Sequence, residues 1–523
     1  MNIVVCDRLE APAEKVLQQS GHTIVLLDSP SEEEIRQHLC QAEAIIVRSH
    51  TTISAALIAA APALKVIGRA GVGSYNIDVE AASKAGVVVL HSPDISSTAA
   101  AELGLCLIIA AARRLWEASL DLQNGVWDRA RLVGTELGGK TLGIVGYGNV
   151  GHKLAAYATA LNMDVIACDP YVRNSGDAIA LLPFQDLLER SDVVVAACAR
   201  TPETEGMFHA DVFAQMKKGA IFVNIANGKL VVEDDLIAAL DTGQLTAAAV
   251  DVYQNEPAGA ENRAVQHPKI FTTPHIGAAT TKAQEGVCVD IVSKVLNYLQ
   301  SGYVAGSINL PVIAESNEVN IAGYLDLAGK LASILAQLDR KTKNFTIELN
   351  GKIADITTNA IENGAIKSFL KAMKVSDVND INAPFLLADQ GVAFTTSRGD
   401  AGGSFVNELV MSTDNASITG TLLADKFPRI VEVNGYRIEA VPAGIILFFR
   451  NYNRPGVIGD IGTLLGQKGV NIANMKLGIR GADEALCMVN IDSPVSADVL
   501  AEIASLNNVI DCLQLELTDA ASQ

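Results

Sequence analysis

The sequence is poor in aromatic residues, in positive charge and in long apolar runs. Aromatic residues make up 5% of the 523 residues while 49% are hydrophobic, so the apolar content comes mostly from Ala, Val, Ile and Leu. That composition favours buried parallel sheets and packed helices. The formal net charge of −19 makes the protein a poor partner for nucleic acid or for an anionic membrane surface. The longest apolar stretch, around Leu103–Ala112, is too short to span a bilayer.

Cysteine is present, but not in the patterns that bind metals or build disulfide frameworks. The eight cysteines include no C-x-x-C pair, and most lie within apolar runs, where cysteine behaves as a small hydrophobic residue. We therefore expect reduced cysteines, no metal site and a cytoplasmic protein. The first residues, Met1–Asp7, have the pattern of a strand rather than that of a signal peptide.

The length exceeds what one hydrophobic core supports, so three or four domains are expected. Short apolar runs alternate with helical segments through the first 300 residues, which is typical of βαβ units and parallel sheets. One long helix, about Thr98–Asn124, separates two such series. The first series has strands near Ile3–Val5, Thr23–Leu27, Ala44–Val47, Lys65–Gly68 and Gly86–Leu90, and the second near Thr141–Val145, Asp164–Cys168, Asp192–Ala196, Ala220–Asn224 and Ala247–Asp251.

The last 200 residues follow a different pattern. After Asn309-Leu310-Pro311 polar turns become frequent and alternating strands such as Phe345–Leu349 occur, so we expect a mixed α/β domain without a chemical motif over residues 312–443. From Gly444 onward the order is strand, helix, strand, strand, helix, strand, the split βαβ order. The predicted fold class is α/β, with two doubly wound Rossmann-like domains, a mixed domain and a ferredoxin-like C-terminal domain.

The strongest local motif is Gly146-Tyr147-Gly148-Asn149-Val150-Gly151, which follows an apolar strand and opens a helix expected over Val150–Leu161. Glycines at this spacing allow a tight turn, a close approach of the backbone to a pyrophosphate, and packing of the helix on the strand. The helix N-terminus then offers free N–H groups to the phosphates. The alternative is a glycine-rich turn that binds no nucleotide.

Asp169 lies 18 residues after Gly151, at the end of the next strand. A carboxylate there accepts hydrogen bonds from the ribose hydroxyls and repels a 2′-phosphate, so NAD is expected rather than NADP. Arg173 lies close enough in the sequence to leave NADP open.

Beyond these motifs, the chain resembles the D-2-hydroxyacid dehydrogenases, and most closely the members that oxidise phosphoglycerate and carry a C-terminal regulatory extension. The matching segments are Gly68–Gly73, Gly134–Leu137, Asp251–Tyr253 with Glu256-Pro257, and Thr273–Ala278. The resemblance implies a substrate domain split around the nucleotide domain. The implied boundaries are 1–95 and 278–311 for the substrate domain, 96–277 for the NAD-binding domain, 312–443 for an intervening domain and 444–523 for an ACT domain.

The resemblance also implies the cofactor contacts. Besides Gly146, Gly148, Asn149, Val150, Gly151 and Asp169, they are Thr201, Ile225, Ala226, Asn227, Asp251, His275, Ile276, Gly277 and Ala278.

Oxidation of a 2-hydroxy acid removes a hydride from C2 and a proton from its hydroxyl group. The proton needs a base with a pKa near neutrality, which points to His275. A carboxylate bonded to the far imidazole nitrogen would orient the ring, and Glu256 suits that role. An isolated histidine beside Pro274 is ordinarily a loop or cap residue. Here His275 lies 19 residues after Glu256, and because this spacing matches the family, a catalytic role is favoured.

An anionic substrate requires cations. Arg48-Ser49 follows the strand Ala44–Val47, where the family binds a phosphoryl group, and Gly71-Val72 lies in a matching segment. Arg129 and Arg131 precede Gly134–Leu137, where some members supply an arginine from a neighbouring subunit. Each of these arginines could instead be a solvated surface residue.

Three residues depart from the family pattern. Asn227 stands where the family has an arginine that holds the substrate carboxylate, and Asn offers only a neutral amide. If the segment is extended, Lys229 shares a face with Asn227 and could supply the missing charge. Ser96 replaces a substrate-contacting Asn, and Ala199 replaces a Pro.

The segment Gly444–Thr518 resembles an ACT domain, a module that in this family pairs edge to edge and binds an amino acid. The resemblance places an effector such as L-serine near Asn453, Gly456, Val457 and Asn471. Asn453 stands where some relatives have an acid, so weak serine binding is expected. A dimerisation module without a ligand is the alternative.

Three functions remain open from the sequence. The first is NAD-dependent oxidation of 3-phospho-D-glycerate to 3-phosphohydroxypyruvate, which opens serine synthesis, by a homo-oligomer that is a dimer or a homotetramer. The second is the same chemistry on another small anionic 2-hydroxy or 2-oxo acid. The third is a catalytically weak NAD-binding protein with a regulatory role, which an intact cofactor motif beside a changed Asn227 motivates.

Overall fold

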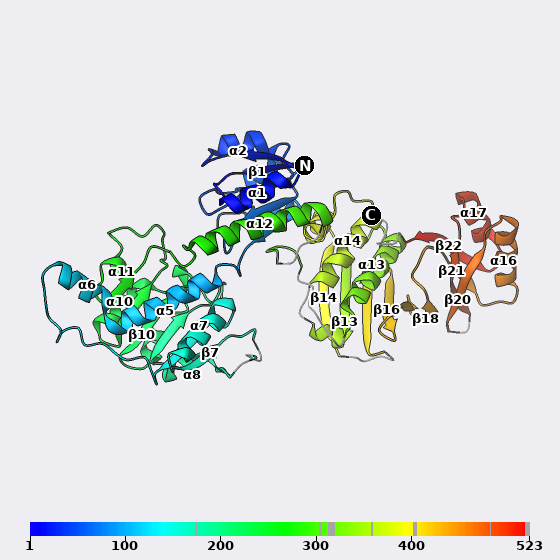
Figure 1. Cartoon of the computed structure of the whole chain (residues 1–523). Helices are drawn as coiled ribbons and strands as arrows, with labels where there is room; N and C mark the ends of the chain where they lie inside the picture. Colours follow the sequence, from blue (N-terminus) through cyan, green and yellow to red (C-terminus); the bar gives the residue numbers. More distant parts are fainter. Residues whose placement is uncertain are drawn as a thin grey trace.

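The structure is a computed structural model that describes residues 1–172, 176, 178–302, 306–311, 319–356, 359–400, 405–481 and 483–517. Arg173, Thr518 and the expected boundary at residue 312 fall outside these ranges. Among the described helices, none combines the length and the apolarity that a membrane span requires. The sheets follow the expected fold class, and Figure 1 shows them as separate lobes along the chain.

The first lobe is a five-stranded parallel sheet in the order β2-β1-β3-β4-β5. The long helix α12 (Thr281–Ser301) packs on this sheet although it lies nearly 200 residues further along the chain. At Gly68 a Cβ would lie 2.6 Å from the side chain of Val295, so helix and strand are in close contact. The other elements are β1 (Asn2–Val5), β2 (Thr23–Leu26), β3 (Ala44–Val47), β4 (Val66–Arg69), β5 (Val88–His91), α1 (Ala11–Gln19), α2 (Glu32–Leu39), α3 (Ala55–Ala59) and α4 (Val79–Lys84).

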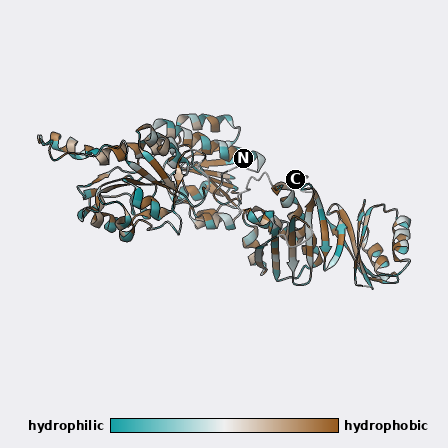
Figure 2. Cartoon of the chain, turned by 90° about the horizontal axis from the view of Figure 1, so that it is seen from below, coloured by the Kyte–Doolittle hydropathy of each residue, from teal (hydrophilic) through white to brown (hydrophobic). Residues whose placement is uncertain are grey.

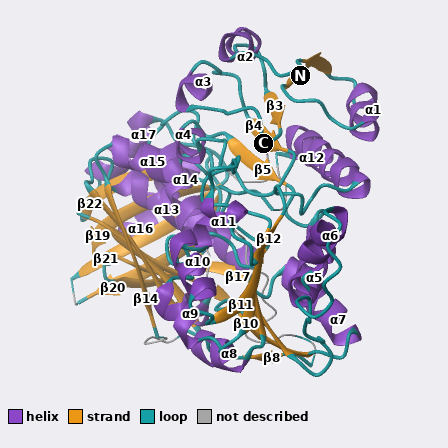
Figure 3. Ribbon diagram, turned by 90° about the vertical axis from the view of Figure 1, so that its left-hand side faces the viewer, coloured by secondary structure: helices purple, strands orange, loops and turns teal. Residues whose placement is uncertain are grey.

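The second lobe is a seven-stranded parallel sheet in the order β12-β11-β10-β9-β6-β7-β8. The strand order reverses beside β6, and in open α/β sheets ligands bind outside the carboxyl ends of the strands at such a reversal. Helices cover both faces, with α5 and α7 on one side and α8 to α10 on the other (Figure 3). The elements are β6 (Thr141–Val145), β7 (Asp164–Cys168), β8 (Ala180–Leu181), β9 (Val193–Ala196), β10 (Ala220–Asn224), β11 (Leu245–Val250), β12 (Ile270–Thr272), α5 (Ser97–Arg113), α7 (Asn149–Ala160), α8 (Phe184–Arg190), α9 (Ala210–Gln215), α10 (Glu233–Asp241) and α11 (Arg263–Gln266).

The prediction of a single helix over Thr98–Asn124 is wrong, because the helix is interrupted at Arg114. Arg114 has φ 52°, in the left-handed region, and separates α5 from α6 (Leu115–Gln123). Its guanidinium bonds the Glu117 carboxylate and the Arg131 carbonyl, which fixes the bend. α6 has no buried residue and projects from the lobe (Figure 1).

The third lobe is a mixed six-stranded sheet in the order β14-β13-β15-β16-β17-β18, covered by α13 and α14. The expected strand Phe345–Leu349 lies within β13 (Asn344–Gly351). The remaining elements are α13 (Ile321–Leu338), α14 (Ala360–Ala372), α15 (Ala383–Asp389), β14 (Ala393–Gly399), β15 (Asn407–Thr413), β16 (Ser417–Leu423), β17 (Phe427–Val433) and β18 (Tyr436–Ala440).

The fourth lobe has the split βαβ order that the sequence predicts. Its antiparallel sheet runs β20-β21-β19-β22, and both helices cover one face. Figure 2 shows hydrophobic strands inside each lobe and more hydrophilic residues on the helices. The elements are β19 (Ile445–Tyr452), α16 (Val457–Gln467), β20 (Ile472–Arg480), β21 (Glu484–Ile491), α17 (Ala497–Ser505) and β22 (Val509–Glu516).

The third and fourth lobes share one hydrophobic core. Ile446, Phe448 and Met488, on the face of the fourth sheet away from its helices, pack with residues of β17, β18 and α13. Gln337 of α13 exchanges two hydrogen bonds with the backbone of Glu516 in β22, and the Tyr436 hydroxyl donates to Glu484 over 2.6 Å. The two C-terminal lobes are therefore packed as one body.

Candidate active site

The glycine-rich loop lies at the carboxyl end of β6 and leads into α7. A Cβ at Gly146, whose φ is 100°, would lie 2.4 Å from the Cys198 amide, and a Cβ at Gly151 would lie 2.4 Å from the Gly146 carbonyl. Gly148, by contrast, faces open space. Gly148 is also the N-cap of α7 and no side chain caps this helix, so its first N–H groups are available to a phosphate. The loop therefore fits a dinucleotide pyrophosphate.

Asp169 lies beside this loop, one residue beyond β7. Its two carboxylate oxygens accept hydrogen bonds from the backbone N–H groups of Tyr147 and Tyr171, each over 2.9 Å. A carboxylate has about four acceptor positions, so it can still accept bonds from ribose hydroxyls. Burial raises the pKa of the nearby Cys198 thiol to about 11, so this thiol stays neutral beside the Asp169 carboxylate.

The remaining expected cofactor residues lie at the same edge of the sheet. The side-chain amide of Asn149 donates to Asp94, and Val150 is half-buried at the start of α7. The Thr201 N–H donates to the Thr204 hydroxyl over 2.7 Å, which closes a small turn. Ile225 and Ala226 follow β10, and the Ile225 side chain packs against Gly104 of α5.

The structure brings His275 and Glu256 together, as the sequence predicts. The His275 Nδ1 atom lies 2.6 Å from the Glu256 Oε2 atom, and the other carboxylate oxygen accepts the Tyr253 N–H over 3.0 Å. The imidazole is 54% exposed, so its Nε2 side can reach a substrate. This arrangement suits a general base with an oriented ring.

Asp251 holds the histidine loop in place. Its buried carboxylate accepts the Thr273 hydroxyl over 2.6 Å and the N–H groups of Ile276 and Gly277, each over 2.9 Å. The His275 N–H donates to the Asp251 carbonyl over 2.9 Å. These bonds fix His275 at φ 53°, and Ala278 follows in the same loop. Asp251 is thus a positioning residue, and its expected cofactor contact stays a prediction.

Asn227 caps a short turn next to this loop. Its Oδ1 accepts the Lys229 N–H over 3.0 Å, and Gly228–Leu230 forms a 3-10 turn. A Cβ at Gly228 would lie 1.9 Å from the Tyr253 carbonyl carbon, so the turn is pressed against the segment that leads to Glu256. Asn227 is therefore at the same edge of the sheet as the histidine pair.

The role expected for Lys229 assumed that the segment from Asn227 to Lys229 is extended, and this assumption is wrong. In a 3-10 turn, residues two apart do not share a face. Lys229 is exposed, and its positive charge, together with the larger effect of Arg200, lowers the pKa of Glu205. Lys229 therefore lies near an acid of its own chain, and its substrate contact stays a prediction.

Sequence reasoning missed Asn224, the last residue of β10. It is 1% exposed, its amide donates to the Asn227 carbonyl over 3.0 Å, and its Oδ1 accepts the Ala226 N–H over 3.1 Å. It shapes the turn that carries Asn227. Its one signal in the sequence is a polar residue at the end of an apolar strand.

Four of the expected substrate residues, Arg48, Ser49, Gly71 and Val72, lie on loops of the first lobe. The Arg48 guanidinium donates to Gln284 of α12 and lies 3.7 Å from Glu10, while Ser49 is exposed. Val72 is 52% exposed, and the adjoining Gly71 carbonyl accepts the Ser92 N–H over 3.0 Å.

Ser96 and Arg129 lie apart from these two loops. Ser96 is buried immediately before α5. Arg131 forms ion pairs with Glu117 and Asp121 of α6, whereas Arg129 is exposed in the loop that follows this helix. Arg129 is therefore better placed than Arg131 to contact another molecule.

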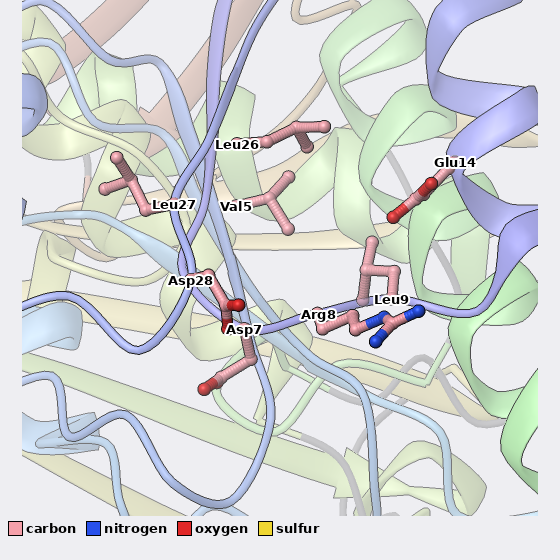
Figure 4. Close-up of a pocket in the computed structure, with 8 residues that line it drawn as sticks. All are labelled: Val5, Asp7, Arg8, Leu9, Glu14, Leu26, Leu27 and Asp28. Carbon is pink, nitrogen blue, oxygen red and sulfur yellow. The ribbon is translucent and has the colours of Figure 1, made fainter.

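A cavity of about 210 Å³ lies at the ends of β1 and β2 (Figure 4). Its charged lining consists of Asp7, Asp28 and Glu14 with the single cation Arg8. An acidic lining does not suit an anionic acid. The cavity therefore does not suit an anionic substrate, and the expected substrate contacts of the Arg48 and Gly71 loops stay a prediction.

In the fourth lobe, one chain does not bring the expected effector residues together. Asn453 follows the end of β19 that pairs with Glu484, whereas Asn471 precedes the end of β20 that pairs with Ile491. Glu484 and Ile491 are seven positions apart along β21, roughly 23 Å at the rise of a strand. Gly456, at φ 99°, and the buried Val457 open α16 on the Asn453 side.

No cluster of metal-ligating side chains occurs among the residues that the structure describes.

Three family models match the chain. They are the NAD-binding domain of D-isomer specific 2-hydroxyacid dehydrogenases over residues 105–277, the D-3-phosphoglycerate dehydrogenase intervening domain over 320–434, and the ACT domain over 445–508. The fold and the site thus define an NAD-dependent D-2-hydroxyacid dehydrogenase.

Curated relatives match nearly the whole chain. D-3-phosphoglycerate dehydrogenase of Archaeoglobus fulgidus is 33% identical, and the match covers 99% of this chain and 100% of the relative. The Bacillus subtilis enzyme of the same name is 31% identical, with 99% of each chain covered. The chain belongs to the D-3-phosphoglycerate dehydrogenase family.

Solved structures match 59% of this chain. A Thermus thermophilus protein matches with a TM-score of 0.55 and 30% identity, covering 59% of this chain and all of its own. The NAD⁺-bound 3-phosphoglycerate dehydrogenase of Entamoeba histolytica matches with a TM-score of 0.50 and 25% identity over 59% of this chain and 98% of its own.

Proposed function

We propose that this protein oxidises 3-phospho-D-glycerate to 3-phosphohydroxypyruvate with NAD⁺, the step that opens serine synthesis. The observation that carries the proposal is the 2.6 Å contact between His275 and Glu256 at the same sheet edge as the open Gly148 loop. Relatives of that name along the full length support the choice of substrate.

The chain's own residues supply the proton chemistry. His275 Nε2 accepts the proton of the C2 hydroxyl, and the Glu256 carboxylate stabilises the imidazolium that forms. When bound, NAD⁺ accepts the hydride that leaves C2, so the two electrons and the proton are accounted for. Asp251 keeps the ring in position, and the Arg48 and Gly71 loops hold the acid.

We propose a homo-oligomer as the working form, and two observations support it. A single chain separates Asn453 from Asn471, so a second copy is needed to combine them in one effector site for an amino acid such as L-serine. The projecting α6 and the loop behind it expose apolar side chains, including Leu120, Leu122, Trp127 and Val133. Soluble monomers rarely expose so many apolar side chains on one segment.

We propose that this apolar segment contacts a second copy, and the family resemblance implies that its Arg129 then reaches the substrate of the neighbouring subunit. Replacing Trp127 with Glu should shift the protein to a smaller species in analytical ultracentrifugation. An unchanged sedimentation coefficient would argue against this interface.

We also propose a cytoplasmic location and the domain boundaries given above. All eight cysteines are free in the structure, which suits a reducing compartment. The packing of α12 on the first sheet supports a split substrate domain.

The deciding experiment is NADH oxidation with 3-phosphohydroxypyruvate beside oxaloacetate, 2-oxoglutarate and glyoxylate. The proposal requires the highest kcat/KM on the phosphorylated acid. A preference for another acid would move the function to that acid, and NADH binding without turnover would leave a regulatory protein.

A further inference from the structure

Buried polar side chains lie beneath the two loops that carry Arg48 and Gly71. In a doubly wound domain, positions this deep are normally apolar. Here each polar side chain bonds another member of the group or the backbone of one of the two loops, so they form one network. The members are Asp7, Thr51, Arg69 and Asn76, all 3–7% exposed.

Asn76 joins the loop after β3 to the loop after β4. Its side-chain amide donates to the Arg48 carbonyl over 2.7 Å and to the Thr51 carbonyl, and its Oδ1 accepts the Arg69 Nε–H over 2.7 Å. One side chain therefore holds both ends of the loop that carries Arg48.

Arg69 holds the other loop. Its guanidinium donates to the Val72 carbonyl and lies 4.4 Å from the centre of the Tyr75 ring. A Cβ at Gly71 would lie 2.7 Å from the Arg69 Nη1 atom, so Gly71 rests directly on the guanidinium. Burial lowers the pKa of Arg69. Its hydrogen bonds to the Asn76 side chain and to the Val72 carbonyl go to neutral acceptors, so the charge is held there at a cost.

Asp7 fixes the Arg48 segment from the opposite side. One carboxylate oxygen accepts the Arg48 N–H and the other accepts the Thr51 hydroxyl over 3.0 Å. The backbone of Arg48 is thus bonded at its N–H by Asp7 and at its carbonyl by Asn76.

We propose that Asn76 and Arg69 are positioning residues that set the separation between Arg48 and the Gly71-Val72 backbone. This inference rests on the proposed function, in which these loops bind the two ends of the acid. A fixed separation between two anchors selects acids by length, so the network is a determinant of specificity as well as of affinity.

The test compares Arg69→Lys and Asn76→Ala with Asn309→Ala as a matched control. Lysine keeps the charge but loses the planar fork that reaches Asn76 and Val72 together. Asn309 makes a similar set of bonds along β5, to the Val89 N–H, the Val87 carbonyl and the Ser83 hydroxyl, away from both loops. If Asn76→Ala fails to fold, Thr51→Val replaces it, because it removes only the hydroxyl bond to Asp7.

Two measurements are made on each variant of the full chain. We expect KM for 3-phosphohydroxypyruvate to rise about tenfold or more in the network variants, with the Kd of NADH within about twofold of the native value. We expect amide hydrogen exchange to accelerate about tenfold in residues 48–51 and 71–73 and to stay unchanged there in Asn309→Ala.

The outcomes separate this inference from the proposed function. Unchanged KM and unchanged exchange, or an equal rise in KM in the control, would overturn the inference. If the native protein prefers another 2-oxo acid, the proposed function fails. The KM of each variant is then compared with the native KM for that acid. If no acid is turned over, hydrogen exchange alone decides whether the network holds the loops.

Discussion

At the scale of single residues, the proposed chemistry depends on His275, a histidine whose position is set by contacts with three neighbouring residues. His275 has a left-handed backbone conformation, and Asp251, Thr273 and Glu256 together fix its backbone and its ring. Because left-handed φ values are uncommon outside glycine, these contacts are needed to keep the imidazole in its working orientation.

Replacing His275 with Ala should lower the rate of turnover by a factor of roughly 100 to 10,000, because proton transfer loses its base. The affinity for NADH, measured by fluorescence titration, should change little. His38→Ala on the exposed face of α2 is the matched control and should retain native activity. Substantial activity in His275→Ala would mean that another group removes the proton.

Replacing Asn227 with Arg should raise kcat/KM on 3-phosphohydroxypyruvate, because a guanidinium binds a carboxylate in a charged, bidentate manner. The same change removes the Oδ1 acceptor of the Lys229 N–H, so we expect it to cost about 1 kcal/mol of stability. Combining it with Lys229→Gly in a double-mutant cycle measures any repulsion between the two cations. If neither variant gains activity and the native protein has normal activity, Asn227 does not face the substrate carboxylate.

At the scale of elements, the sequence predicted most strands of both parallel sheets, because most are short, buried, apolar runs flanked by turns. It missed β8 and β12 at the two edges of the second sheet. It failed at Arg114 and at Lys229, where the conformation depends on distant partners: Arg131 fixes the first, and Tyr253 presses on the turn of the second. The spacing of His275 and Glu256 was informative only through the resemblance. Asn76, Arg69 and Asn224 were missed because a single polar residue beside a strand forms no local pattern.

β5 supplies an acid-sensitive contact to the loop that follows β4. Burial, followed by the charges of Lys294 and Arg69, lowers the pKa of His91, whose Nδ1 accepts the Gly73 N–H over 3.2 Å. A histidine pKa below its ordinary value of 6.5 means that the folded state prefers the neutral ring. The stabilisation is therefore present above pH 6.5 and is lost as the pH falls through the lowered value.

His91→Asn retains an acceptor but cannot titrate. Between pH 7.5 and pH 5.5 the native protein should lose more thermal stability than this variant, measured as the shift of the first unfolding midpoint. Equal losses in both proteins would mean that His91 does not contribute.

At the scale of the whole molecule, the intervening and ACT lobes have a common interior. Adjacent phenylalanines of β19 face opposite sides, since Phe448 packs toward β17 and β18 whereas Phe449 packs toward α16 and α17. The sequence could not predict this packing, because alternation along β19 shows that both faces are apolar but not what covers each of them.

Phe448→Ala should therefore destabilise both lobes, and Phe449→Ala only the last one. Each substitution of a buried phenylalanine costs about 3–5 kcal/mol. Hydrogen exchange in β17 and β18 should accelerate in Phe448→Ala alone, while exchange in α16 should accelerate in both variants. Acceleration of β17 and β18 in Phe449→Ala would contradict the division of the two faces.

The placement of α12 on the first sheet has a consequence during synthesis. The core of that sheet is completed by Val287, Ile291, Val295 and their neighbours, about 200 residues after β5. At 5–20 residues per second, the ribosome needs roughly 10–40 s to produce that stretch. The inserted dinucleotide-binding lobe can thus complete its own sheet on the nascent chain while the N-terminal strands wait with one face uncovered. Chaperones that bind exposed apolar strands have their longest opportunity at the very start of this protein.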